Sequence, residues 1–203
     1  GLDYTQYDTS LSLDRQVNER LTIGGQVIAT YADYTGGQSF YSFGPQATAR
    51  LRLNEQWDLN GAVGVVRTTI DRGPLLGKDN SFDLSLDGSI CSTLSTGRLC
   101  GRVSRRTLSS VVGGAPTTTS AGIDYSRRLS VRDNIRLNFG VARSDNSFGG
   151  VDRKTTFTSL VGSYDRQVSP RLAAGVNLEG RRVAQSGPNP RSDVGGSVFL
   201  RYR

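Results

Sequence analysis

Apolar and polar residues alternate along almost the whole chain, in segments of about ten residues or more. A period of two is typical of β-strands, because successive side chains of a strand point to opposite faces of the sheet. Such segments cover residues 4–17, 21–33, 40–53, 57–69, 81–92, 98–107, 118–129, 135–145, 155–166, 172–183 and 193–203. They exceed the usual globular strand of about five or six residues and match the ~9–11 residues that a tilted strand needs to cross a bilayer. The pattern predicts an all-β protein of eleven long strands.

The composition fits strands that do not enclose a large core. The chain has 203 residues, which is about one domain by length, and only 35% of them are hydrophobic. Its apolar residues stand singly between polar ones, so there is no run of 18 or more that would form a transmembrane helix. We therefore expect one domain over residues 1–203, with one face of its strands suited to lipid.

The connections between the predicted strands alternate in length. Short turns are expected at 18–20, 54–56, 95–96, 130–134 and 167–171, and longer loops at 33–39, 70–80, 108–117, 144–154 and 184–192. Short turns at one rim and long loops at the other are the layout of outer-membrane barrels. A weak hairpin repeat is also present, with a short turn at the middle of each unit. Solenoids and propellers are repeat folds as well, but their strands are usually shorter. We predict an antiparallel up-and-down transmembrane β-barrel of about 11–12 strands, with short periplasmic turns and longer extracellular loops.

The apolar face keeps its parity through each turn, as a hairpin requires. Leu11 and Leu13 lead to Leu21 and Ile23 on one face, and a slip of one residue would move that whole face to the other side. The opposite face carries charge and is predicted to line the lumen. Its predicted lumenal residues are Arg50, Arg52, Arg102, Arg106, Arg128, Arg136, Arg181, Asp14, Asp58, Asp83, Asp87, Asp124 and Glu179.

The two cysteines test this pairing independently. With Ser95 and Thr96 at the turn, Cys91 lies directly opposite Cys100 on the polar face. Opposed positions of an antiparallel pair are close enough for a disulfide, which we predict near the short-turn rim. A disulfide indicates an oxidising compartment such as the periplasm. The alternative is two unpaired thiols.

Four arginines fall on the apolar face, toward the long-loop end. Arg67, Arg105, Arg143 and Arg182 each lie about ten residues from the short-turn end of their strand. Because ten residues of tilted strand span roughly 25 Å of hydrocarbon, these side chains should reach the outer head groups. There they would pair with phosphates of lipopolysaccharide. The alternative is that these interfacial arginines extend to the head-group region without binding a specific ligand.

The last strand carries the one family resemblance in the chain. In "GGSVFLRYR", Gly196, Val198, Leu200 and Tyr202 alternate toward the terminus, which resembles the C-terminal signature of bacterial outer-membrane β-barrel proteins. The resemblance implies the cell outer membrane of a Gram-negative bacterium, contact with outer-membrane lipid, and recognition by the barrel assembly machinery. The family usually ends in Phe, so we expect either an aromatic residue after Arg203 or Tyr202 in its place. Because bacterial barrels usually have an even strand number, a twelfth strand is expected before Gly1 or from another segment.

The residue types present narrow the function. The chain has no histidine, whereas the barrel hydrolases and acyltransferases use Ser-His or Asp-His arrangements, so we predict that it is not an enzyme. It has no phosphate-binding loop, dinucleotide fingerprint or metal cluster, so no cofactor, metal or nucleic-acid partner is expected. We predict an outer-membrane channel or export component that passes small or anionic solutes, or a polymer, through an arginine-lined lumen. The alternative is an anchor barrel without an open pore, which would hold a periplasmic or surface partner, an N-terminal domain or a surface structure. A secreted β-rich fibre subunit is a more remote alternative.

Overall fold

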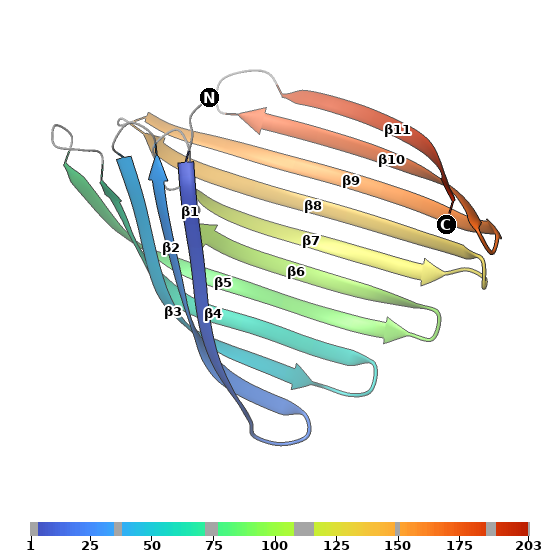
Figure 1. Cartoon of the computed structure of the whole chain (residues 1–203), viewed down its shortest axis with the longest axis horizontal. Coiled ribbons are helices and arrows are strands. Elements are labelled where there is room, and N and C mark those ends of the chain that lie inside the picture. Colours follow the sequence, from blue (N-terminus) through green and yellow to red (C-terminus); the bar gives the residue numbers. More distant parts are fainter. Residues whose placement is uncertain are drawn as a thin grey trace.

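The computed structural model describes residues 4–34, 38–71, 77–107, 116–148, 151–185 and 190–202. These residues form eleven β-strands in one sheet (Figure 1). The strands are β1 (Tyr4–Gln16), β2 (Leu21–Tyr34), β3 (Gln38–Arg52), β4 (Trp57–Asp71), β5 (Lys78–Leu94), β6 (Gly97–Thr107), β7 (Thr117–Arg128), β8 (Asp133–Phe148), β9 (Val151–Ser169), β10 (Leu172–Gln185) and β11 (Arg191–Tyr202). Each of the eleven predicted segments is a strand, so the all-β prediction is confirmed. The described part of the chain contains no helix that is long and apolar enough to cross a membrane.

Every strand pairs antiparallel with its neighbour in the chain, in the order β1 to β11. The predicted up-and-down topology is therefore confirmed. The hairpins form because each polar turn joins two amphipathic strands whose apolar faces agree in parity. Asn18 and Asn54 help to close the first two turns, since each side-chain carbonyl accepts hydrogen bonds from two backbone amides further along the turn.

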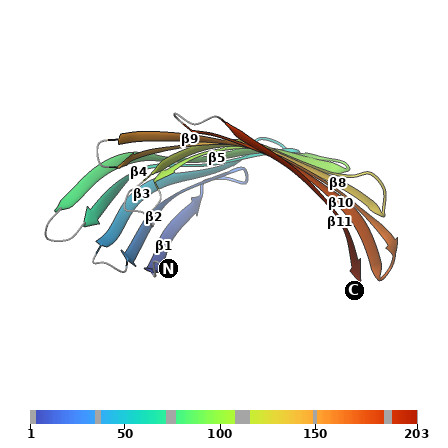
Figure 2. The same ribbon diagram turned by 90° about the horizontal axis from the view of Figure 1, so that it is seen from above.

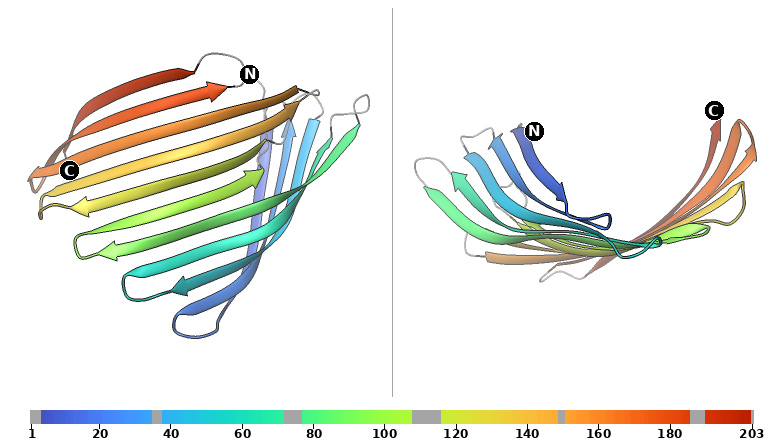
Figure 3. Two further views of the ribbon diagram at one scale, coloured as in Figure 1. Left: turned by 180° about the vertical axis from the view of Figure 1, so that it is seen from behind. Right: turned by 90° about the horizontal axis from the view of Figure 1, so that it is seen from below.

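At the short-turn end of the sheet, successive hairpins are staggered along the strand direction. Trp57 at the start of β4 pairs with Ser92, while β5 continues to Leu94; Asp133 pairs with Arg166, while β9 continues to Ser169. Each hairpin thus projects beyond the previous one in the same direction, as the left view of Figure 3 shows. A stagger of constant sign means that the strands are tilted, which is the geometry of a sheet that curls toward a barrel.

The sheet bends into a deep arch but does not close (Figure 2; Figure 3, right). Within the described residues β1 pairs only with β2, and β11 pairs only with β10. Because β1 and β11 are both odd-numbered in an up-and-down sheet, the two free edges run in the same direction. The predicted strand before Gly1 and the predicted aromatic residue after Arg203 lie outside the described residues.

The strands extend further toward the long-loop end than the alternation pattern indicates. A loop was expected over 144–154, yet β8 and β9 stay paired up to Phe148 and Val151. Residues 38 and 39, within another expected loop, belong to β3. The antiparallel ladder satisfies backbone amides and carbonyls whatever the side chains are, so pairing continues past the point where the alternation ends.

Candidate functional site

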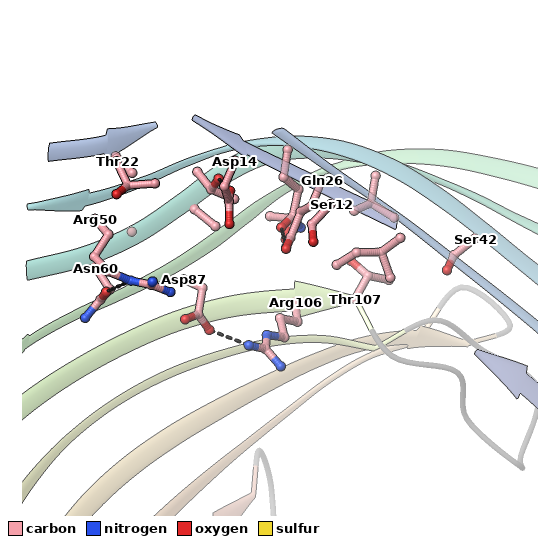
Figure 4. Close-up of a pocket in the computed structure, with 18 of the residues that line it drawn as sticks. Ser12, Asp14, Thr22, Gln26, Ser42, Arg50, Asn60, Asp87, Arg106 and Thr107 are labelled. Carbon is pink, nitrogen blue, oxygen red and sulfur yellow. Dashed lines mark hydrogen bonds and ion pairs between the residues drawn. The ribbon is translucent and has the colours of Figure 1, made fainter. Parts of the chain in front are cut away.

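The two faces of the arch differ in chemistry. On the convex face large apolar side chains are exposed; Leu13 exposes 78% of its surface, Leu178 62% and Val198 78%. The concave face carries rows of hydrogen-bonding and charged side chains, among them Asp14, Gln26 and Arg50 (Figure 4). Because successive residues of a strand point to opposite faces, the alternating sequence produces this division directly. The concave face is the candidate functional site.

A row of polar side chains crosses the concave face from β2 to β5. The register aligns Gln26, Gln46, Gly64 and Ser85. Gln26 Nε2 donates to Gln46 Oε1 at 2.6 Å, and Gln46 Nε2 donates to Ser85 Oγ at 2.7 Å. The second bond passes over β4, which is possible because Gly64 has no side chain: a Cβ there would lie 2.6 Å from Gln46 Cγ. The row joins four strands on the inner side of the arch.

Glycine allows a second bridge in the neighbouring row. Thr48 Oγ1 donates to Asp14 Oδ1 at 3.3 Å across β2, where a Cβ at Gly24 would lie only 2.1 Å from that carboxylate oxygen. Both rows line a cavity of about 610 Å³ on the concave face of β1–β6 (Figure 4). Arg50 and Asn60 also line it, and Arg50 Nε donates to Asn60 Oδ1 at 3.0 Å.

Three of the predicted arginines form ion pairs with predicted carboxylates along this face, and a fourth predicted carboxylate lies near another arginine. Arg106 binds Asp87, and Arg102 binds Asp124, which also accepts a bond from Asn138. Arg181 binds Glu179. The fourth carboxylate, Asp58, lies 3.7 Å from Arg98, an arginine not among those predicted. The remaining predicted carboxylate, Asp83, accepts a bond from Thr117 Oγ1 at 3.4 Å.

Other predicted arginines of this face have no such partner. Arg52, Arg128 and Arg136 form no ion pair within the part of the chain that the structure describes. The concave face therefore contains a neutralised central region and, toward the short turns, a surplus of positive charge. No group of three or more His, Cys, Asp or Glu side chains suited to a metal ion occurs among the described residues.

The predicted disulfide is present between Cys91 and Cys100. The two residues pair directly in the β5–β6 hairpin, close to the turn at Ser95 and Thr96. Cys91 is 5% exposed, and the register places it beside Asp58 of β4. The bond therefore holds the short-turn end of the hairpin next to the Arg98–Asp58 contact.

The four arginines predicted to face lipid lie on the same side of the sheet as the exposed apolar residues. The Arg67 guanidinium lies 5.8 Å from the centre of the Phe82 ring, and Arg105 donates to Thr119 Oγ1 at 3.3 Å. Arg143 Nε lies 3.2 Å from Asp145 Oδ1. Arg182 stands between Thr158 and Ser192 in the register and forms no ion pair within the described residues.

Apolar residues on the concave face were not among the predicted site residues. Ala32 and Phe40 are buried there toward the long-loop end, together with the polar Thr68, whose hydroxyl has no hydrogen-bond partner among the described residues. Phe199 of β11 lies over Gly175, where an added Cβ would be 2.4 Å from its ring. The signal was in the sequence: Phe40 and Phe199 both fall on the polar parity of their strands.

Comparison with known proteins gives a likeness in fold only. No family model and no curated protein matches the chain. The crystal structure of a Pseudomonas aeruginosa FadL homologue is similar with a TM-score of 0.41 and 10% sequence identity, covering 94% of this chain and 76% of that one. The β domain of the Bordetella autotransporter Brka is similar with a TM-score of 0.40 and 14% identity, covering 99% of this chain and 91% of that one.

Proposed function

We propose that this sheet is the wall of an outer-membrane β-barrel and that its concave face lines an aqueous lumen. The observation that carries the proposal is the division of the sheet into an apolar convex face and a polar concave face. Moving one side chain such as Leu13 or Val198 from water to an apolar environment contributes about 1.5–3 kcal/mol. A soluble monomer rarely exposes so continuous an apolar surface, whereas lipid would cover it.

Strand direction constrains how such a barrel would close. The free edges of β1 and β11 run in the same direction, so a strand that pairs antiparallel with both must run opposite to them. An odd number of further strands satisfies this requirement, and a twelfth strand is the smallest solution. Closure would also remove the two exposed edges, which otherwise present unpaired backbone groups that lipid cannot satisfy.

We infer that the barrel is a channel for small or anionic solutes. Arg52, Arg128 and Arg136 add positive charge and form no ion pair among the described residues of the concave face. Rings of basic side chains favour anions in a water-filled pore.

Conductance of the full-length protein in planar bilayers tests the channel. We expect an open pore that prefers anions, and Arg50→Glu/Arg52→Glu on the concave face should shift the preference toward cations. The matched control, Arg67→Glu/Arg143→Glu on the convex face, makes the same charge change and should leave selectivity unaltered. A wild-type pore that prefers cations, or equal shifts in both variants, would contradict a lumen on the concave face.

An anchor barrel without an open pore is the second candidate. It is favoured by the burial of Ala32, Phe40 and Thr68 on the concave face, because packed side chains there narrow the space inside the arch toward the long-loop end. Persistent electrical silence of a protein that migrates as a heat-modifiable folded barrel would support the anchor over the channel.

We also propose that the convex arginines bind phosphate groups of lipopolysaccharide. The register places Arg105 and Arg143 on either side of Thr119, so two guanidinium groups flank one hydroxyl, and Arg143 also contacts Asp145. Such a row can hold a phosphate through charge-assisted hydrogen bonds. Native mass spectrometry should show less retained lipopolysaccharide in Arg105→Gln/Arg143→Gln than in a concave-face control, Arg50→Gln/Arg52→Gln. Equal retention of lipopolysaccharide by the two variants would contradict the proposal and indicate that the convex arginines only extend to the head-group region.

A further inference from the structure

We propose that the short-turn end of the concave face holds a binding site for a small multivalent anion. A cavity of about 770 Å³ lies there on strands β7 to β11, apart from the cavity of β1–β6. Its arginines are Arg128, Arg132, Arg136, Arg171 and Arg201. The site takes a ligand that carries two or more phosphate or carboxylate groups.

The register places three of these arginines on the same face of the sheet, independently of the shape of the cavity: Arg128 and Arg136 on neighbouring strands and Arg201 on β11. One row of paired residues runs Arg136, Ser163, Asn177, and the next runs Arg128, Asn134, Asp165, Gly175, Phe199. A third row, nearest the turns, pairs Ala173 with Arg201. These are successive rows on the same face, because every second residue of a strand returns to it. Arg132 and Arg171 belong to the two turns that border the rows.

The carboxylates nearby do not neutralise this cluster. Asp133 already accepts hydrogen bonds from Ser130 Oγ and Tyr164 OH and lies 3.7 Å from Arg166 Nε. Asp165 accepts a bond from Asn134 Nδ2 at 3.3 Å. None of the five arginines forms an ion pair within the described residues. Five arginines therefore line a cavity with two carboxylates, Asp165 and Asp133, of which Asp133 already contacts Arg166.

In the central region of the same face, by comparison, arginines are paired with carboxylates. There, Arg102 and Arg106 are each matched by an aspartate on an adjacent strand. Like charges held together without counter-charge destabilise a folded protein unless an anion compensates them. The arginines at the turns, which have no ion-pair partner among the described residues, thus indicate a binding site for an anion. The ion-paired arginines of the central region indicate a role in holding neighbouring strands together.

An aromatic side chain covers part of the sheet within the cavity, so a ligand can approach only from the concave side. The Phe199 ring lies over Gly175, and the Arg201 guanidinium is 5.7 Å from the centre of that ring. The Phe199 ring covers the backbone at Gly175, so this part of the cavity surface is apolar. The guanidinium groups around it can then bind a ligand on the side that faces the concave space. Guanidinium forks bind phosphate and carboxylate in a bidentate manner, which lysine cannot do.

The site deepens the proposed function, since it rests on the concave face being open to water, but it does not require a conducting pore. In the orientation expected for an outer-membrane barrel, the short turns face the periplasm. A cluster there would gather anions at the periplasmic mouth.

Isothermal titration of the folded full-length protein in zwitterionic detergent tests the site, with tripolyphosphate and citrate as probes. We expect binding of at least one probe. Because a charge-assisted hydrogen bond contributes about 1.5 kcal/mol or more, Arg128→Gln/Arg136→Gln should raise Kd roughly tenfold for each guanidinium removed. The matched control, Arg102→Gln/Arg106→Gln, removes the same charge from the neutralised central region of the same face and should leave Kd within about twofold.

Several results would overturn the proposal. They are no binding of either probe, an unchanged Kd in the concave variant, or equal weakening in the control, which would mean attraction to net charge alone. If Arg128→Gln/Arg136→Gln does not fold, as judged by circular dichroism and heat-modifiable migration, Arg201→Gln takes its place with the same expectation. Tighter binding of tripolyphosphate than of citrate would identify a phosphate ligand, and the reverse a carboxylate. Anion binding by an electrically silent protein would refute the channel and retain the site.

Discussion

Gly64→Ala tests how the inner face of the arch holds neighbouring strands together. The added Cβ would lie 2.2 Å from the Pro45 carbonyl oxygen and 2.6 Å from Gln46 Cγ, so backbone as well as side chain must shift. Overpacking of this kind costs about 1–3 kcal/mol. Displacing Gln46 also breaks its bond to Ser85, worth about 1 kcal/mol, while alanine offsets about 0.5–1 kcal/mol by restricting the unfolded chain. The net expectation is a loss of about 1–3 kcal/mol in the free energy of unfolding.

Urea unfolding in detergent micelles, followed by fluorescence of the single tryptophan Trp57, measures this loss. Two variants separate its parts. Ser85→Ala removes the hydrogen bond without a clash and should cost about 1–3 kcal/mol, because Gln46 Nε2 is left buried without a partner. Gly180→Ala places a Cβ where no atom lies within 4 Å, so it should be neutral or stabilising by up to about 1 kcal/mol. A Gly64→Ala protein as stable as Gly180→Ala would refute the reasoning.

Three further predictions use the same unfolding assay. Cys91→Ser/Cys100→Ser opens a loop with a sequence separation of 9 and should lower the free energy of unfolding by about 2.5 kcal/mol; reductant should do the same to the wild type, and an unchanged midpoint would show that the β5–β6 ladder alone holds the hairpin. Thr68→Val replaces a hydroxyl that is buried without a partner among the described residues, so it should be neutral or stabilising by up to about 1 kcal/mol, and a clear loss would reveal a hydrogen bond that this side chain makes. Arg102→Gln removes an ion pair whose arginine side chain is 60% exposed, so it should cost no more than about 1 kcal/mol and less at high salt; a cost independent of salt would contradict a screened surface pair.

The predicted strands and their parity agree with the structure because both depend on local rules. Alternation decides which residues share a face, and the turn residues decide which strands pair; the opposition of Cys91 and Cys100 follows from these two alone. The strand ends were less accurate: β8 and β9 extend beyond the alternating segments, since backbone pairing does not require it.

The contacts across the concave face could not be predicted in the same way. The bond from Gln46 to Ser85 depends on the absence of a side chain at Gly64, on the strand between them. Gln46 and Gly64 are 39 and 21 residues from Ser85 in the chain, so no local pattern links the three. Parity placed Arg102, Arg128 and Asp124 on one face, but it did not show that Arg102 meets Asp124 while Arg128 meets no carboxylate among the described residues.

The sequence by itself determined the eleven strands, their antiparallel order and the chemistry of each face, because a period of two acts within a strand and across one turn. The tertiary structure decided which charges are neutralised and which are gathered at the short turns, because that depends on stagger. The stagger of the hairpins brings the β7–β8 turn close to the end of β9 and to the β9–β10 turn. As a result, Arg128, Arg132 and Arg171 line one cavity. A tilt shared by all the strands is a property of the whole sheet, which no single segment encodes.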